Sequence, residues 1–466
     1  MNTTDIRGLA LTGATPSSAA RLDRATELLA GFYADPLAEI DAAIEEAPGM
    51  VMGHCLRAAL FLISSDRACE EELGRSVAAA EALAAQATDR ERGHIAAARA
   101  WLAGDYARAG DLYGRVALEN PHDLLALQIA HQCDFFTGRS GMLRDRVAQV
   151  LPRWDGDVPG FGYVLGMHAF GLEETNLYAR AEEAGRRAVA LNPRDPWAVH
   201  AVAHVMEMEG RTGDGIAWLN GTREHWAADN MFAFHNWWHL ALHHLDREET
   251  GRVLALYDEA VRPQSNNAAL EMIDASALLW RLRLRGIDAG DRWDRLADDW
   301  APLADQGYYA FNDVHALMAF IGAGRAKEIR RVVAGLERAA LGSGDNAMMS
   351  REVGLPLARA LLDFEAGRWA DAATALWSLR ERAHRFGGSH AQRDLIQQTL
   401  LEAVLRQGDA PLARALAAER TEMKPSSVWN WRAAHRAATA AGDQAAARRA
   451  AANAVALLPA AAGVAA

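Results

Sequence analysis

Residues 101–109 read Trp-Leu-Ala-Gly-Asp-Tyr-Ala-Arg-Ala, and Asn120-Pro121 follows eleven positions later. The small Gly104-Asp105 turn lets one helix fold back on another, with alanine where the two backbones come closest. The Asn-Pro pair ends the second helix, because the residue before a proline is pushed out of the helical region. This stretch therefore predicts an antiparallel helical hairpin.

The same hairpin recurs along the chain. Pro193 and Pro263 follow Pro121 at intervals of about 70 residues, roughly twice the 34-residue period of a tetratricopeptide unit, and further turns of this kind lie at 364–372 and 407–409. One helix pair cannot bury its apolar face alone, so stacked pairs share a continuous core and curve into a superhelix. We therefore predict an all-α, tetratricopeptide-like helical-repeat solenoid with a concave inner surface.

The organisation of the chain follows from this repetition. We expect an N-terminal tail over residues 1–20, a single α-helical repeat array over 21–457 and a C-terminal tail over 458–466. No stretch has the composition of a flexible linker, and the Gly- and Asp-rich residues 155–162 are the best candidate for a break in the array.

Composition and charge limit the classes of partner that we expect for the protein. The 466 residues are 50% hydrophobic and 24% charged, which suffices for a large core. Lys plus Arg is 49 against 61 for Asp plus Glu, a formal charge of −12, which argues against nucleic-acid and polybasic membrane partners. We also find no signal sequence and no apolar stretch of about 20 residues. We expect a cytoplasmic protein without nucleic-acid or membrane partners, and a homo-oligomer is compatible with the sequence.

Histidine is concentrated in one short part of the chain. At about 100° per residue, His200, His204 and Glu207 share one face of a helix. His235 and His239 repeat the four-residue spacing on the next candidate segment. Adjacent helices of a repeat array are expected to bring these two imidazole pairs and the carboxylate close together.

Three interpretations of this cluster stay open. The imidazoles can be structural, hydrogen-bonded within the inner wall. They can form a polar ligand or acid–base site, because histidine carries protons near neutral pH. They can also hold a divalent metal, although the glutamate of the H-E-x-x-H zinc motif is missing. The candidate ligands of such a metal site are His200, His204, Glu207, His235 and His239.

Two further segments carry candidate polar residues. Asn312 or Asp313 suits the N-cap of the helix that continues through His315, and either can instead orient a ligand. Asn236 and Trp238 lie between the second pair of histidines, where a tryptophan serves either as core or as the wall of a pocket.

A fourth candidate is the stretch Gly-Gly-Ser-His-Ala-Gln-Arg-Asp at residues 387–394. Ser389 and Gln392 match a capping box, which begins a helix. The amides of a helix N-terminus favour an anion and are expected to lower the pKa of His390, which would keep it neutral. Arg393 offers a fixed positive group for a carboxylate or phosphate.

These observations predict a helical-repeat protein that binds a small polar or anionic ligand, or a peptide, in a His- and Trp-lined concave pocket. The alternative is a hydrolase- or lyase-type enzyme that uses the same histidines in metal-assisted or acid–base chemistry, so whether the protein is an enzyme stays open. The candidate catalytic residues are His204, His239, His315 and His390, and the candidate substrate-binding residues are His200, His235, Asn236, Trp238, Asn312, Asp313, Ser389 and Arg393.

Several of these segments form a recognisable set. They include His-Ala-Val-Ala-His-Val at 200–205 and His-Asn-Trp-Trp-His-Leu-Ala-Leu at 235–242, together with residues 274–282, 292–293, 311–320, 354–361 and 388–394. Taken together, they resemble the tetratricopeptide repeat protein 38 family over most of the chain. The resemblance implies an α-helical repeat protein and brings no catalytic residue set with it.

Overall fold

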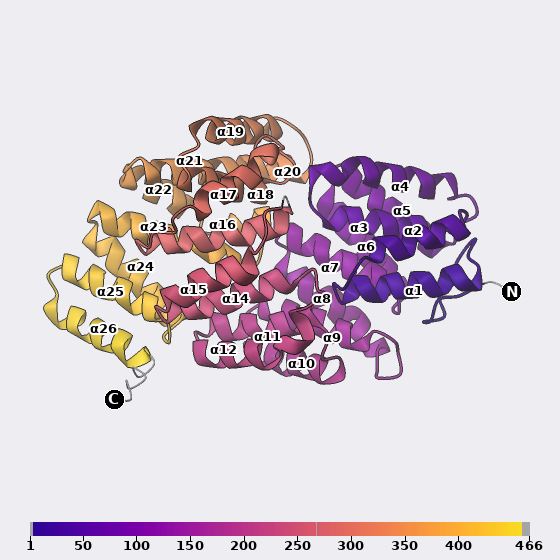
Figure 1. Cartoon of the computed structure of the whole chain (residues 1–466), viewed down its shortest axis with the longest axis horizontal. Coiled ribbons are helices and arrows are strands. Elements are labelled where there is room, and N and C mark those ends of the chain that lie inside the picture. The colour runs from indigo at the N-terminus through magenta and orange to yellow at the C-terminus, as the bar shows by residue number, and fades with distance from the viewer. Residues whose placement is uncertain (1–2, 267, 459–466) are drawn as a thin grey trace.

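Helices make up most of the chain in the computed structural model, which describes residues 3–266 and 268–458 (Figure 1). Within these ranges, strand pairing is limited to two isolated bridges, Thr4–Ala10 and Tyr33–Asn230. Successive helices pack in pairs, as α9 (Phe161–Glu173) does with α10 (Tyr178–Leu191). The predicted all-α, tetratricopeptide-like solenoid is therefore confirmed.

The described residues of the first half of the chain contain thirteen α-helices, and one of them, α11, supplies His200 and His204. They are α1 (Pro16–Ala30), α2 (Pro36–Glu46), α3 (Val51–Ile63), α4 (Glu70–Ala82), α5 (Asp89–Leu102), α6 (Tyr106–Glu119), α7 (Leu124–Phe136), α8 (Ser140–Val150), α9, α10, α11 (Pro196–Met208), α12 (Thr212–Gly221) and α13 (Arg223–Trp226).

The second half continues the array to the C-terminal end of the described chain. Its helices are α14 (Ala233–Asp246), α15 (Thr250–Leu256), α16 (Ala269–Leu284), α17 (Arg292–Trp300), α18 (Ala310–Gly322), α19 (Ala326–Ala340), α20 (Asp345–Met349), α21 (Leu355–Glu365), α22 (Trp369–Leu379), α23 (His390–Gln407), α24 (Ala410–Met423), α25 (Val428–Ala440) and α26 (Gln444–Leu457). Among the described residues, no helix is both long and apolar enough to cross a bilayer.

The hairpin predicted from residues 101–109 is formed by α5 and α6. Gly104 turns the chain with φ of +85°, a value that a residue with a side chain rarely adopts. Trp101 and Tyr106 stack across the turn with ring centroids 4.1 Å apart. The second helix stops before Asn120, whose side-chain amide donates to the Val116 carbonyl at 3.1 Å. The local sequence therefore sets both the turn and the end of the hairpin.

The superhelix brings distant repeats into contact. The Tyr309 hydroxyl donates to the carbonyl of Phe136 at 3.0 Å, and the Asn312 amide donates to the carbonyl of Ser65 at 3.1 Å. In Figure 1 the orange α20 lies next to the indigo and violet N-terminal helices, and the Asp345 amide there donates to the Gly104 carbonyl at 3.0 Å. These contacts join segments that are roughly 170 to 250 residues apart, unlike the neighbour-only contacts of an open solenoid.

The structure differs from the expected boundaries at the N-terminus. Helix α1 begins at Pro16, within the residues 1–20 predicted as a tail. Leu11 is buried and the Thr12 hydroxyl donates to Glu91 at 2.6 Å, because the segment packs against α5. One hydrophobic core runs from here to the C-terminal helices. Of the predicted tails, residues 1–2 and 459–466 lie outside the described residues.

A buried ion-pair cluster fixes the junction between α5 and α7. Asp123 accepts from Arg90 at 2.7 Å, lies 2.9 Å from His94 Nε2 and caps α7 through the Ala126 amide at 2.9 Å. Burial alone raises the pKa of Asp123, but the His94 ring and the Arg90 guanidinium outweigh it and hold this pKa well below its usual range.

Asp123→Asn is expected to lower the free energy of unfolding at pH 7 by about 1.5–3 kcal/mol, because the amide keeps the cap but loses the charge opposite Arg90. Because the folded pKa of Asp123 is depressed, its stabilising contribution is present above the unfolded pKa of about 3.9 and is lost as the pH falls below it. Urea unfolding between pH 3 and 7 measures both effects. The half-exposed pair of Asp41 and Arg57 is the control, and Asp41→Asn should cost about 0–1 kcal/mol. Equal losses in the two variants would contradict the prediction.

Candidate functional site

Four histidines from two neighbouring helices form one buried cluster, which we call the tetrahistidine cluster. Helix α11 supplies His200 and His204, and α14 supplies His235 and His239. The four-residue spacing places both members of a pair on the same helix face. Each ring offers one nitrogen, and these four nitrogens all lie within 4.8 Å of one another. The repeat architecture thus brings the two imidazole pairs together.

The two histidine rings that α14 supplies are each oriented by a carboxylate from another helix. His235 Nδ1 lies 2.5 Å from Asp274 Oδ2, and His239 Nδ1 lies 2.8 Å from Glu207 Oε2. An ionised carboxylate only accepts hydrogen bonds, so in both rings Nδ1 carries the proton. The Nε2 atoms of the two rings point away from these carboxylates and lie 3.3 Å from each other. His200 Nε2 completes the group at 3.0 Å from His235 Nε2.

The electrostatics disfavour a positive charge on two of the four rings, His200 and His239. Burial, followed by the charges that neighbouring imidazoles would carry, lowers the pKa of His200 and of His239 well below its usual value. A proton on one ring would face three other rings in a region that excludes water. At neutral pH these two histidines are therefore neutral imidazoles with free lone pairs.

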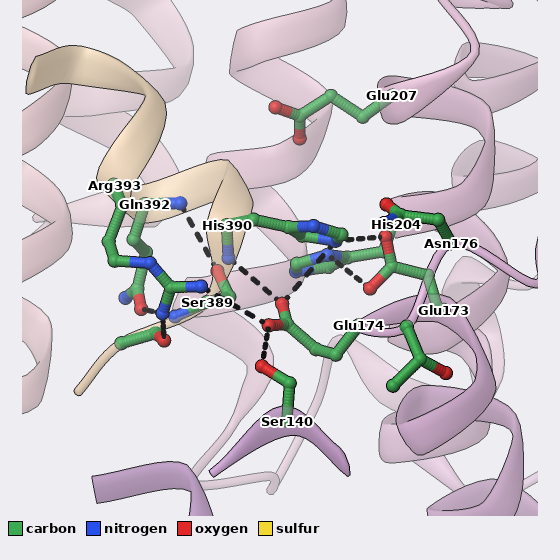
Figure 2. Close-up of polar contacts among 12 residues, drawn as sticks. Ser140, Glu173, Glu174, Asn176, His204, Glu207, Ser389, His390, Gln392 and Arg393 are labelled. Carbon is green, nitrogen blue, oxygen red and sulfur yellow. Dashed lines mark hydrogen bonds and ion pairs between the residues drawn. The ribbon is translucent and has the colours of Figure 1, made fainter. Parts of the chain in front are cut away.

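A second group of side chains adjoins the cluster at His204. Glu173 ends α9, Glu174 follows it, and His390 begins α23. His390 Nε2 lies 2.6 Å from Glu173 Oε1, and His204 Nδ1 lies 3.3 Å from Glu173 Oε2. Figure 2 shows the two glutamates pointing toward the rings of His204 and His390. The group joins α9 and α11 to a helix that comes about 200 residues later in the chain.

This group corrects the interpretation of His390 as a neutral base. Burial lowers the pKa of His390, but the adjacent carboxylates of Glu173 and Glu174 outweigh burial and raise this pKa to about 9. The ring is therefore protonated at neutral pH. The expected anion at the N-terminus of α23 is also part of the chain, since the His390 amide donates to Glu174 Oε1 at 2.9 Å. The helix N-terminus does bind a carboxylate, but that carboxylate is Glu174.

The loop before α23 is held by its own backbone. The Ser389 side chain accepts from the Gln392 amide at 3.1 Å, and the Gln392 side chain accepts from the Ser389 amide at 3.0 Å, as the capping box predicts. The Arg393 guanidinium donates to the Gly388 carbonyl and lies 3.6 Å from Glu174. The role of Arg393 in holding a ligand anion stays a prediction, and in this structure the chain itself supplies partners for the guanidinium.

The paired glycines let this loop approach α18. Gly387 and Gly388 have φ values of +87° and +75°. A Cβ atom on Gly387 would lie 2.0 Å from the Tyr309 hydroxyl, and one on Gly388 would lie 2.4 Å from the Phe311 ring. Only glycine fits at both positions, which places Ser389 and Gln392 beside the α18 aromatics.

A cavity of about 550 Å³ lies against the tetrahistidine cluster. Its polar lining includes His200, His235, Asp274, Ser389 and Gln392, which form one connected chain of hydrogen bonds. The remaining walls are predominantly apolar and include Phe32, Leu60, Phe61, Phe135, Trp197, Phe232 and Phe311. The cavity therefore combines an apolar body with one polar region at the histidines.

The candidates on α18 lie outside both the cluster and the cavity lining. His315 Nδ1 donates to the Phe311 carbonyl at 2.7 Å, and burial lowers the pKa of His315 to about 4. Burial raises the pKa of Asp313 to about 7. Helix α18 begins at Ala310, so Asn312 and Asp313 lie within it and neither is its N-cap. Asn312 is used in the contact with Ser65.

The two remaining candidates, Asn236 and Trp238, pack next to the cluster and do not line the cavity. Asn236 donates to the Pro196 carbonyl at 3.3 Å, and Trp238 is fully buried with its ring stacked 5.3 Å from that of His235. His204 and His239 also lie outside the lining, so only His200, His235 and Ser389 among the predicted site residues meet the cavity directly.

Sequence reasoning missed the acidic residues of the site. Glu173 ends a helix that is otherwise almost wholly apolar, Glu174 follows it, and Asp274 lies within the buried α16. An acidic side chain in an apolar helical run requires a buried partner. That signal was present in the sequence and would have pointed to all three carboxylates.

Comparison with known proteins gives only distant matches. No family model matches the chain. It is similar to the human IFIT1 dimer with m7Gppp-AAAA, at 12% identity and a TM-score of 0.41, over 94% of each chain. It is also similar to the human IFIT1 dimer with PPP-AAAA, at 11% identity and a TM-score of 0.40, again over 94% of each chain. This likeness is too distant to assign a ligand or a reaction to the protein.

The comparison corrects one expectation from composition. The exclusion of nucleic acid as a partner is withdrawn: the two similar structures are described with m7Gppp-AAAA and PPP-AAAA, a property of those proteins, and the net charge of this chain cannot support the exclusion. The physical reason is that a net charge averages over the whole surface, whereas binding depends on the local field. The charge of −12 therefore does not exclude this class of partner.

Proposed function

We propose that the protein binds a compact small molecule whose apolar body occupies the cavity and whose polar end meets His200, His235 and Asp274. The observation that carries this proposal is the junction of apolar walls with one hydrogen-bonded polar chain in a single cavity. A cavity of about 550 Å³ has the size of a pocket for one compact ligand, which favours a small molecule over an extended peptide.

The polar end of the ligand is proposed to be uncharged. The Asp274 carboxylate lines the cavity and would repel an anionic group. His200 Nδ1 is buried without a partner, so it can accept from or donate to a hydroxyl, amide or carbonyl group. This replaces the polar or anionic ligand expected from sequence, because most of the wall is apolar and the anion-binding helix N-terminus already holds Glu174.

We further propose that the chain is a member of the tetratricopeptide repeat protein 38 family. The support is spatial. Four of the segments that carry the resemblance, at residues 200–205, 235–242, 274–282 and 388–394, supply the tetrahistidine cluster and the polar lining of the cavity. Segments that share one site are expected to be retained together in a family.

Filling the cavity tests the proposed function. Leu60→Trp places a larger side chain in the lining, and Leu118→Trp places the same side chain on an exposed surface of α6. The wild-type protein and Leu118→Trp are expected to bind the neutral probe N-phenyl-1-naphthylamine saturably at about one equivalent. Leu60→Trp should bind it at least about tenfold more weakly, measured by probe fluorescence. Equal binding by the two variants, with circular dichroism showing both folded, would refute the proposal.

A further inference from the structure

We infer that His200, His204, His235 and His239 hold one divalent first-row transition-metal ion. The inference goes beyond the proposed ligand binding and does not depend on what occupies the cavity. It rests on the spacing of the ring nitrogens, the unpaired Nε2 atom of His204 and the carboxylates around the rings.

Two ring nitrogens already have the spacing of a metal site. Because Asp274 and Glu207 accept from the Nδ1 atoms of His235 and His239, Nε2 is the nitrogen that each ring offers to a cation. The two Nε2 atoms lie 3.3 Å apart. A cation between them would form a coordinate bond to each. With metal–nitrogen bonds of about 2.0–2.1 Å, the edge of a tetrahedral site is about 3.3 Å, which matches this distance.

The His204 ring carries a buried nitrogen that a metal would satisfy. His204 Nε2 has no hydrogen-bond partner, while Nδ1 faces Glu173. His204 is fully buried and His200 is 1% exposed. An unpaired buried polar atom destabilises the fold. A purely structural role for the histidines would leave this cost at His204 uncompensated.

The outer carboxylates have the arrangement that metal-binding histidines require. A ligating histidine usually donates its other nitrogen to a carboxylate, which fixes the ring and strengthens the ligand. Asp274 and Glu207 do this for His235 and His239, and Glu173 lies 3.3 Å from His204 Nδ1. The predicted ligand Glu207 is therefore an outer partner. These carboxylates also balance the charge of a buried dication.

The donor set selects the class of ion. Imidazole nitrogen suits zinc, iron, cobalt, nickel and copper, whereas magnesium and calcium take oxygen ligands. Four imidazoles complete a tetrahedral site around zinc and leave open positions on a six-coordinate ion. Because His200 and His235 line the cavity, an open position on their side would face the polar end of the ligand.

The test is metal binding by the full-length protein. Protein stripped with a chelator is titrated with Co²⁺ and with Zn²⁺, and bound metal is measured by elemental analysis after desalting. Wild-type protein should retain about one equivalent and show cobalt absorption bands in the visible range. His239→Gln should weaken Co²⁺ binding at least tenfold. His243→Gln is the control, since His243 is another buried histidine of α14 but lies outside the cluster.

The outcomes separate this inference from the proposed ligand binding. Less than about 0.2 equivalents of metal in wild-type protein without cobalt bands, or equal affinity in His239→Gln and wild type, would overturn the inference. If His239→Gln does not fold, the stripped wild-type protein decides, since it must gain thermal stability on addition of Zn²⁺ and His243→Gln must gain it equally. Binding of N-phenyl-1-naphthylamine by stripped protein reports on the cavity alone.

Discussion

Glu173→Ala is expected to lower the free energy of unfolding by about 3–5 kcal/mol. Glu173 is fully buried, pairs with His390 at 2.6 Å and faces His204 at 3.3 Å. Its removal leaves Glu174 as the only carboxylate beside the protonated His390 and weakens the contact between the end of α9 and α23. Equilibrium urea unfolding at pH 7, with a chelator present so that bound metal does not contribute, measures the change.

Two other variants show whether the buried charge is responsible. Glu183→Ala removes an exposed glutamate from α10 and should change the free energy of unfolding by no more than about 0.5 kcal/mol. Glu173→Gln keeps the shape of the side chain and should lose less stability than Glu173→Ala. A loss in Glu173→Ala that is no larger than that in Glu183→Ala would show that this carboxylate does not stabilise the fold.

Trp238→Ala is the second change with a large expected effect, a loss of about 3–5 kcal/mol. The Trp238 ring is fully buried, stacks on His235 with an interplanar angle of 12°, and has the Arg281 guanidinium 5.3 Å from its centroid. Alanine would leave a cavity beneath the tetrahistidine cluster. Thermal and urea unfolding both measure the loss.

The adjacent tryptophan is a matched control. Trp237 is partly exposed and packs against Trp226 with ring centroids 4.8 Å apart. Because it buries less surface, Trp237→Ala should cost about half as much as Trp238→Ala. An equal loss of stability in the two variants, or a larger loss in Trp237→Ala, would contradict the assignment of Trp238 to the centre of the core.

Much of the fold could be predicted from local sequence. A Gly-Asp turn and an Asn-Pro end determine the α5–α6 hairpin regardless of the rest of the chain, and the capping box at Ser389 begins α23 in the same way. The spacing of His200 with His204, and of His235 with His239, likewise defines a helix face. These features depend on residues only a few positions apart.

The environment of the site could not be predicted in this way. The pKa of His390 was expected to fall because it begins a helix, yet Glu173 and Glu174 raise it from a helix about 200 residues earlier. The cavity walls come from aromatic and aliphatic residues on many helices, and each of them resembles an ordinary core residue when it is considered alone. Long-range packing determines both features, and a single sequence contains no local signal for it.

The contact between Glu173 and His390 constrains how the array can change in length. An open repeat array can gain or lose a unit in the middle, since each unit meets only its neighbours. Here the helices between α9 and α23 must return His390 to within 2.6 Å of Glu173. One inserted or deleted unit would rotate and shift α23 and separate the partners. The number of repeats in this interval is therefore fixed by the site, so insertions are tolerated only in surface loops or beyond these two helices.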